Sequence, residues 1–364
     1  MNLFYANEIE ALKRSGRYRE RRIYDASIVD LASNDYLGLA EEPLLFKAAC
    51  ERLERAPSHG PKASMLVNGY HPIHADFERA LCEANGFEAG VIVGSGFSAN
   101  IAMIEALVRK GDELFIDEKY HASGILATHL SDGKITYFRH NDPEALERLL
   151  QRSVAKRKIV AVEGIYSMDG DLLEREIIAL ADRYEALLII DEAHSSGVVG
   201  SNLMGVFDHY GIAVAPNHIK MGTLGKAYGA FGAYILASEH IVDYLLNRAK
   251  PLIYATAPSL FETASAHGSL EYIRTNAASL REKISERQQV VLERLGMTMP
   301  GLIAPVVIGD NRRVVAIREA LIKEGILVGA IRQPTVPKAI IRLIARTNID
   351  VGLLRHTCDV ISRF

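Results

Sequence analysis

The chain has 364 residues, of which 49% are hydrophobic and 24% are charged, and its formal net charge is −3. This balance is ordinary for a globular protein and gives no reason to expect nucleic acid or an anionic membrane as the main partner. The three cysteines, Cys50, Cys82 and Cys358, are far apart and form no CxxC pair. We therefore expect no metal site and no disulfide framework, and a reducing cytoplasm fits best. No apolar run is long enough to cross a membrane, and the first residues lack the pattern of a secretory signal.

Residues 1–40 form a distinct N-terminal arm. Residues 8–24 are charged and predict a helix with a cluster of arginines at 14, 17, 19, 21 and 22. Such a run is typical of a solvated helix face, and a ligand-binding role is the alternative.

From about residue 41 the sequence alternates between helical and strand patterns. Helices are expected at 43–55, 73–85, 98–110, 143–151 and 174–184, and strands at 90–94, 113–117, 135–138, 158–162, 187–191, 218–221 and 230–237. The strands are short and continuously apolar, as in parallel sheets that helices cover on both faces. We predict a large α/β domain over residues 41–250 with a mostly parallel, doubly wound sheet.

A smaller α+β domain is predicted over residues 251–364. A long helical stretch at 260–295 leads into strands at 303–308, 326–331 and 340–344, with helices at 312–324 and from 351. Ligands of open α/β sheets bind beyond the carboxyl ends of the strands. Asp191, His194, Ser167 and the pair Ser95-Gly96 all follow predicted strands, so we expect them to converge there.

Lys226 is the most informative residue of the chain. It lies in the segment Gly225-Lys226-Ala227-Tyr228-Gly229, just past a predicted strand end, while an earlier apolar strand ends in Asp191. An amine that forms a Schiff base, together with a carboxylate that holds a pyridinium proton, is the equipment of a pyridoxal phosphate (PLP) enzyme. Taken alone, Asp191 could equally well be a structural residue, either a helix cap or a turn residue, as a ligand of the cofactor. His194, three residues later, is placed to reach the phenolic oxygen of the ring.

Other segments carry weaker signals for the same cofactor. Residues 93–100 read as a strand, a glycine turn and a helix start, which binds phosphate well, although most such turns only connect elements. Thr223 and either Ser195 or Ser196 offer further hydroxyls. An isolated histidine such as His121 is usually structural, but it also suits stacking on a ring and acid–base work. Ser167 stands in a turn-rich loop after a strand and is a candidate cofactor contact.

Several segments, in a fixed order, resemble those of the α-oxoamine synthase family of fold-type I PLP enzymes, and the resemblance covers nearly the whole chain. The matching segments are Ser33-Asn34-Asp35-Tyr36-Leu37-Gly38-Leu39, Ser95-Gly96-Phe97, Tyr120-His121-Ala122-Ser123, Ser167-Met168-Asp169-Gly170, Asp191-Glu192-Ala193-His194, Thr223-Leu224-Gly225-Lys226 and Pro334-Thr335-Val336-Pro337.

The resemblance implies a role for each matching residue. PLP would form a covalent aldimine with Lys226, which later removes the α-proton of the amino acid. The implied catalytic residues are Lys226, His121, Asp191 and His194. The implied cofactor contacts are Gly96, Phe97, His121, Ser167, Asp191, His194, Thr223, Lys226 and, across a homodimer interface, Thr256. The implied substrate ligands are Arg19, Asn34, His121, Thr335 and Arg342.

Two of these assignments leave alternatives open. Any of Arg17, Arg19 and Arg22 is placed to meet an acyl-donor phosphate, and we take Arg19. Arg342 stands in an otherwise apolar strand, where a charge is costly unless it is paired or reaches a ligand. A strand-face arginine paired within the small domain is the other interpretation, and Arg346 is then the next candidate for binding a substrate carboxylate.

The pair Glu163-Gly164 and residues 330–337 most resemble the biotin-pathway branch of the family. That branch condenses L-alanine with a pimeloyl thioester of coenzyme A or a carrier protein, and releases carbon dioxide and the free thiol. Glycine with acetyl-CoA, or another amino acid with a longer acyl-CoA, would keep the mechanism. A catalytically silent subunit would lack the Schiff-base lysine, and the segment Pro334-Thr335-Val336-Pro337 argues against a generic aminotransferase.

Overall fold

The structure is a computed structural model that describes residues 2–364. The chain divides into two compact units. The large unit comprises residues 35–167 and 171–284, and the small unit comprises the N-terminal residues through Asn34, residues 168–170 and residues 285–364. Within residues 2–364, no helix combines the length and the apolar character that a bilayer crossing requires.

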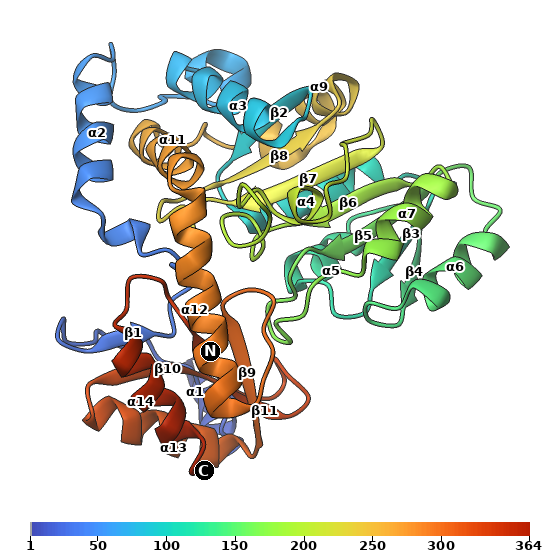
Figure 1. Ribbon diagram of the computed structural model, residues 1–364. Coiled ribbons are helices and arrows are strands. Elements are labelled where there is room, and N and C mark those ends of the chain that lie inside the picture. Colours follow the sequence, from blue (N-terminus) through green and yellow to red (C-terminus); the bar gives the residue numbers. More distant parts are fainter. Residues whose placement is uncertain (1) are drawn as a thin grey trace. The chain divides into compact units, whose positions relative to one another are not determined.

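A seven-stranded sheet forms the centre of the large unit (Figure 1). Its strands, in spatial order, are β2 (Ala89–Val93), β8 (Ala233–Ala237), β7 (His218–Thr223), β6 (Leu187–Asp191), β5 (Lys158–Glu163), β3 (Glu113–Asp117) and β4 (Lys134–Phe138). Neighbouring strands from β7 to β4 pair in parallel, and only β8 runs against its two neighbours. The predicted fold class, a mostly parallel α/β sheet, is confirmed.

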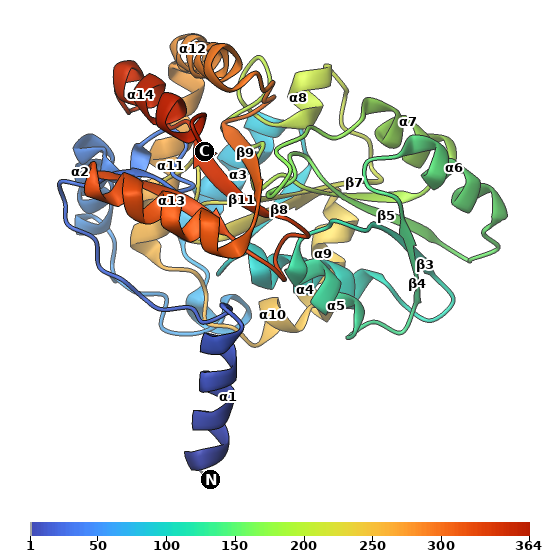
Figure 2. The ribbon, with the colours of Figure 1, turned by 90° about the horizontal axis from the view of Figure 1, so that it is seen from below.

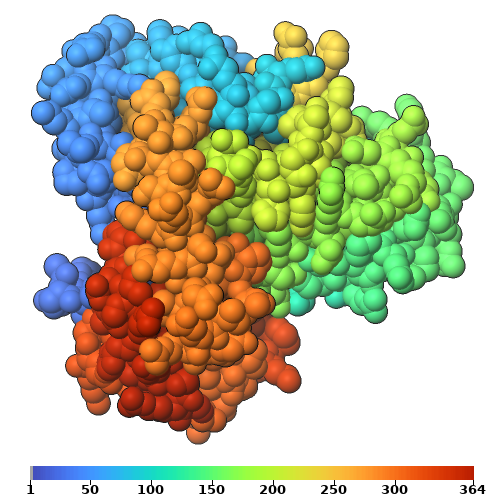
Figure 3. All heavy atoms as spheres, in the orientation of Figure 1, coloured from blue at the N-terminus to red at the C-terminus, as the bar shows by residue number. Residues whose placement is uncertain are grey.

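Helices surround this sheet, and most follow the predicted pattern. They are α2 (Pro43–Glu54), α3 (Pro72–Asn85), α4 (Gly96–Leu107), α5 (Ala122–Thr128), α6 (Pro143–Arg152), α7 (Arg175–Arg183), α8 (Val206–Tyr210), α9 (Glu239–Arg248), α10 (Lys250–Ile253) and α11 (Leu260–Thr275). Short helical turns occur at Leu39–Glu41 and Met65–Gly69. Atoms of α2 are visible on the face shown in Figure 3, where the segment is blue. By contrast, α4 is buried from Ala102 to Leu107 and forms a hydrophobic core with the sheet.

The strand register sets the position of the site. Glu163 at the end of β5 pairs with Asp191 at the end of β6, and Asp191 pairs with Met221 of β7. Because side chains of residues paired in register project to the same face, Glu163 and Asp191 lie side by side at the carboxyl edge of the sheet. The same edge receives the N-terminus of α4, whose first turn is capped by the Ser95 hydroxyl accepting the Ser98 N–H at 3.1 Å.

The small unit is built on a four-stranded sheet in the order β1 (Val29–Leu31), β10 (Ile326–Ile331), β11 (Ala339–Ile344) and β9 (Ile303–Gly309). β1 pairs in parallel with β10, and the other pairs are antiparallel. α13 (Asn311–Lys323) packs on β10 and β11, and α14 (Val351–Ile361) closes the chain (Figure 2). α1 (Asn2–Arg14) is exposed from Leu3 to its end.

Three boundaries differ from those expected. The N-terminal helix ends before Gly16, whose φ of 66° is the left-handed conformation that terminates helices. The stretch 260–295 is two helices, α11 and α12 (Ala277–Leu295), which are separated at Asn276. The large unit continues to residue 284 rather than 250, because α11 packs against α2 and α3 of that unit.

Candidate active site

Lys226 follows β7 in a turn whose flanking residues include Gly225 and Gly229. Its Nζ lies 2.8 Å from Nε2 of His194, and Nδ1 of His194 is hydrogen-bonded to the hydroxyl of Tyr36. The amine, the imidazole and the buried phenol thus form a continuous chain of polar groups within the large unit. Tyr36 belongs to the segment of residues 33–39 that carried the family resemblance, but its contact with His194 was not predicted.

Asp191 is held rigidly at the end of β6, with only 4% of its surface exposed. Its Oδ2 accepts a hydrogen bond from Nδ2 of Asn100 at 2.8 Å, and its Oδ1 accepts one from the backbone N–H of Ala193 at 3.0 Å. Asn100 is oriented in turn by the Tyr120 hydroxyl, which donates to its Oδ1 at 2.7 Å, and by the Ser123 hydroxyl, which accepts from its Nδ2 at 2.9 Å. Two N–H donors therefore stabilise the Asp191 carboxylate.

His121 caps the N-terminus of α5. Its Nδ1 lies 2.7 Å from the Ser123 hydroxyl and accepts the backbone N–H of Ser123 at 3.3 Å. Partial burial lowers the pKa of His121. The charge of Asp191 raises the pKa of His121, and the charge of Lys226 lowers it. The imidazole therefore lies close enough to interact electrostatically with both groups.

Glu163 has a buried carboxyl group for which the sequence predicted no role. It is 2% exposed, and its Oε2 accepts the backbone N–H of Ser167 at 3.3 Å. Its Oε1 is buried without a hydrogen-bond partner among residues 2–364. Burial raises the pKa of Glu163 well above its usual value, and the neighbouring Asp191 raises it further, while Lys226 opposes the shift. The sequence signals were its position at a strand end and the resemblance of the pair Glu163-Gly164, neither of which gave Glu163 a role.

The start of α4 lies against the end of β7. A Cβ atom on Gly96 would lie 3.8 Å from both the Thr223 Cβ and the Met221 Sδ, so the helix start lies against the strand end. The Thr223 hydroxyl donates to the Gly232 carbonyl at 3.1 Å and accepts the Gly225 N–H at 3.3 Å. The free backbone N–H groups of the first turn of α4, including that of Phe97, suit a phosphate.

The other hydroxyls predicted to contact a phosphate are Thr256 and either Ser195 or Ser196. The Ser195 hydroxyl donates to the buried Glu192 at 2.6 Å, and the Ser196 hydroxyl accepts from Tyr234 at 3.0 Å. Both serines are buried, so the idea that one of them contacts a phosphate is wrong. Thr256 is exposed at the surface of the large unit.

The small unit brings the predicted substrate ligands together in pairs. Nη1 of Arg342 donates to Oδ1 of Asn34 at 2.9 Å, and Arg342 is 6% exposed. Nη2 of Arg19 donates to the Thr335 hydroxyl at 3.1 Å. Arg19 and Thr335 line a cavity of about 240 Å³ together with Arg17, Ala330, Ile331, Arg332 and Gln333.

These residues fit PLP. Lys226 would supply the amine, Asp191 would supply a buried carboxylate for the ring nitrogen, and the N-terminus of α4 would supply N–H groups for the phosphate. Beside Asp191, the buried Oε1 of Glu163 has no hydrogen-bond partner in the part of the chain that the structure describes. When bound, PLP forms a Schiff base with an amine and withdraws electrons from the adjacent carbon. The fold and this set of groups define a fold-type I PLP transferase.

A match to the aminotransferase class I and II family covers residues 26–361, so the chain belongs to that family. The 8-amino-7-oxononanoate synthase of Helicobacter pylori (strain ATCC 700392 / 26695) is 41% identical over 342 residues, which are 93% of this chain and 91% of the relative. The 8-amino-7-oxononanoate synthase of Herminiimonas arsenicoxydans is 37% identical over 360 residues, which are 92% of each chain.

Solved structures agree with these sequence relatives. The serine palmitoyltransferase of Sphingomonas wittichii matches with a TM-score of 0.89 and 25% identity, over 99% of this chain and 96% of that one. The 8-amino-7-oxononanoate synthase of Francisella tularensis matches with a TM-score of 0.77 and 26% identity, over 93% and 98% of the two chains. The predicted resemblance to α-oxoamine synthases is confirmed, as is the predicted class of PLP-dependent acyltransferase of the 8-amino-7-oxononanoate synthase type.

Proposed function

We propose that the protein condenses L-alanine with a pimeloyl thioester to give 8-amino-7-oxononanoate, carbon dioxide and the free thiol. The observation that carries the proposal is the Lys226 amine, 2.8 Å from His194, in the same unit as the buried Asp191. The names of the relatives support the substrates, which this chain's geometry does not specify.

The residues of the large unit would perform the proton transfers. Lys226 would carry PLP and then, once the amino acid has displaced it, take the α-proton with its free Nζ. His194 would orient that amine through the 2.8 Å contact, with Tyr36 fixing the ring of His194. His121 would stack on the ring of PLP, and Asp191 would keep its nitrogen protonated. Thr223, Gly96 and Phe97 would hold the phosphate, and Ser167 would contact the cofactor.

The small unit would supply the anion ligands. Arg342 and Asn34, already bonded to each other, would bind the carboxylate of L-alanine, because the arginine fork is bidentate. Arg19 and Thr335 would contact the acyl donor, and the charges of Arg17 and Arg332 in the same cavity suit a phosphate or carboxylate. The carrier of the acyl group would be coenzyme A or an acyl carrier protein.

We also propose that the active form is a homodimer, with Thr256 reaching the phosphate of the partner subunit. Apolar side chains that face solvent in the single chain support this proposal. On α1 they include Leu3 (79% exposed), Phe4 (63%) and Tyr5 (63%). In the large unit they include Val67 (78%) and Tyr254 (79%), two residues before Thr256. Sedimentation at decreasing concentration, with activity measured alongside, tests it, and a fully active monomer would contradict it.

Product analysis tests the substrate assignment. Purified protein is incubated with L-alanine, glycine or L-serine against acetyl and pimeloyl thioesters, and product masses are read directly. Serine is included because serine palmitoyltransferases share the fold at TM-score 0.89. The proposal predicts product mainly from L-alanine with the pimeloyl thioester. A preference for glycine with acetyl-CoA would replace it with the alternative reaction.

The free cysteines Cys50, Cys82 and Cys358 support the proposal of a reducing, cytoplasmic setting.

A further inference from the structure

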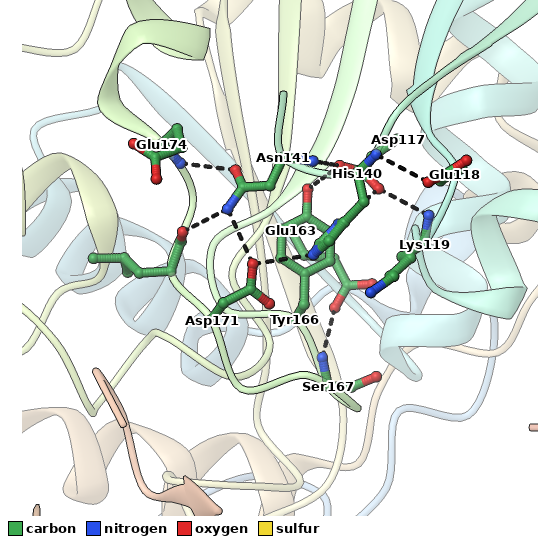
Figure 4. Close-up of polar contacts among 11 residues, drawn as sticks. Asp117, Glu118, Lys119, His140, Asn141, Glu163, Tyr166, Ser167, Asp171 and Glu174 are labelled. Atoms are coloured by element: carbon green, nitrogen blue, oxygen red, sulfur yellow. Dashed lines mark hydrogen bonds and ion pairs between the residues drawn. The ribbon is translucent and has the colours of Figure 1, made fainter. Parts of the chain in front are cut away.

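His140 lies just after β4 and joins two carboxylates (Figure 4). Its Nδ1 is 3.1 Å from Oδ1 of Asp117, and its Nε2 is 3.0 Å from Oδ2 of Asp171. A neutral imidazole has only one N–H, whereas an imidazolium has two. Both contacts are therefore satisfied only when the ring is charged, and neither nitrogen then has a lone pair for a metal ion.

The surrounding groups support the charged form. Burial lowers the pKa of His140, but the hydrogen bonds and charges of Asp117 and Asp171 outweigh it and raise the pKa to about 9. Asp117, although fully buried, has a lowered pKa because its hydrogen bonds, first of all that from His140, outweigh the effect of burial. Further ionisable groups of the surrounding segments are Glu118, Lys119, Arg139, Asp142, Glu163, Tyr166, Asp169 and Glu174, of which Tyr166 packs edge-on against the His140 ring.

His140 is linked to both ends of the loop of residues 164–172, which follows β5, through Asp117 at its start and through Asp171 at its end. At the start of the loop, the Tyr166 hydroxyl donates to Oδ2 of Asp117 at 2.8 Å. At its end, Asp171 bonds to His140 directly and accepts from Nδ2 of Asn141 at 3.0 Å. The two ends also pair with each other, through the bridge between Ile165 and Leu172 and the Tyr166 N–H, which donates to the Asp171 carbonyl at 3.1 Å.

This loop carries Ser167, whose N–H donates to Glu163, the carboxyl group in register with Asp191. A shift of the loop would therefore move the Ser167 N–H away from Glu163, whose carboxyl group interacts with the charge of Lys226. We propose that His140 is a positioning residue of the candidate active site, whose imidazolium fixes the loop of residues 164–172 and so sets Ser167 and Glu163 in place. This proposal deepens the proposed function and rests on it for the catalytic consequence alone.

The test starts with the cofactor-free protein, so that it does not depend on activity. His140→Gln retains one donor and one acceptor and cannot serve both carboxylates. Asp171→Asn keeps the ring and its Asp117 contact, and so serves if the first variant folds poorly. The control is His356→Gln, a histidine of the small unit that also bonds to a carboxylate, Glu324, at 2.9 Å. Amide hydrogen exchange is then followed along the chain.

We expect faster exchange confined to residues 164–172 in His140→Gln and Asp171→Asn, and unchanged exchange there in His356→Gln. In the wild type, protection of the loop should be complete below the ordinary histidine pKa of 6.5 and be lost as the pH rises through about 9. The ring proton resonances of His140 should titrate in the same range, and Asp171→Asn should lower that pKa.

The catalytic consequence is read as kcat against KM. A loop displaced by about 1 Å costs up to about a hundredfold in rate, so kcat should fall while KM for L-alanine changes little. Unchanged loop exchange in both variants, faster exchange spread over the whole unit, or titration of His140 near 6.5 would each overturn the positioning role. If the wild type makes no product from L-alanine and a pimeloyl thioester, the proposed function fails, while exchange and titration still decide the role of His140.

Discussion

Replacing Asp191 by asparagine removes one charge from the candidate site at nearly constant shape. Each carboxylate oxygen of Asp191 now accepts one N–H, from Asn100 at 2.8 Å and from Ala193 at 3.0 Å. An asparagine amide has one oxygen and one NH₂ group. In the Asp191→Asn variant, one of the two donors would therefore face another donor, in either orientation of the new side chain.

Two separate losses follow from this geometry. A hydrogen bond to a charged group contributes about 1.5–3 kcal/mol, so the free energy of unfolding of the cofactor-free protein should fall by roughly that amount. The charge that would face the ring nitrogen of PLP is preorganised and buried. Removing a preorganised electrostatic group of this kind raises the barrier by about 2.7–4 kcal/mol, which corresponds to a loss of about 10²–10³-fold in kcat.

The assay compares Asp191→Asn with Asp208→Asn. Asp208 belongs to the same unit, and its Oδ2 accepts the backbone N–H groups of Asn202 at 2.7 Å and Met204 at 3.1 Å. Its Oδ1 accepts Nδ2 of Asn202 at 3.0 Å, so an asparagine at position 208 also leaves one N–H donor facing its own NH₂ group. Denaturant unfolding and turnover with L-alanine and pimeloyl-CoA are measured for both. Asp208→Asn should lose stability but retain kcat. If the two variants lose kcat equally, the assignment of Asp191 to the ring nitrogen is refuted.

Three further predictions concern single residues. Lys226→Ala should bind no PLP that borohydride fixes to the protein, and a covalent adduct at wild-type stoichiometry would exclude Lys226 as the Schiff-base residue. Arg342→Lys keeps the charge but loses the bidentate fork, so binding of L-alanine, followed by absorbance, should weaken while PLP content and thermal stability persist. Loss of PLP and unfolding would instead make Arg342 structural. Glu163 has a raised pKa, so the folded chain keeps a proton that the unfolded chain releases above about pH 4.3, and this contribution to stability falls as the pH rises. Because glutamine mimics the protonated form, the unfolding free energy of Glu163→Gln relative to that of the wild type should increase as the pH rises above about 4.3. A difference that stays constant with pH would show that Glu163 has the same pKa in the folded and the unfolded chain.

Local sequence patterns were enough to predict most of the large unit. Its strands are apolar on both faces and its helices begin at clear signals, such as Asp142 followed by Pro143 at the start of α6. β1 was missed because a three-residue strand carries almost no periodic signal and forms only by pairing with β10, almost 300 residues later. The break at Asn276 was missed because no proline or glycine marks it.

The residues of the candidate site that could be predicted are those whose residue type and local sequence already point to a chemical role. A glycine-flanked lysine and a carboxylate at a strand end identified Lys226 and Asp191 from local sequence. Tyr36, Asn100 and Glu163 were not assigned, because their roles arise from contacts with residues far away in the chain. Asn100, for example, reaches Asp191 across 91 positions. Its type, an asparagine inside an apolar helix, was the one available signal, since a buried amide needs partners.

The parallel register has an electrostatic consequence at the carboxyl edge of the sheet. Adjacent strands are about 4.8 Å apart, and two carboxylates at about 5 Å repel by about 3 kcal/mol at an effective dielectric constant of about 20. The hydrogen-bond donors decide which group holds a proton. Asp191 accepts two N–H groups, whereas Glu163 accepts one at 3.3 Å and its second oxygen has no partner among residues 2–364. Glu163 is therefore the member of the pair that keeps a proton, and the raised pKa of Glu163 has the same direction. Because the loop that carries Ser167 supplies its one donor, fixing that loop also fixes how readily Glu163 exchanges its proton beside Lys226.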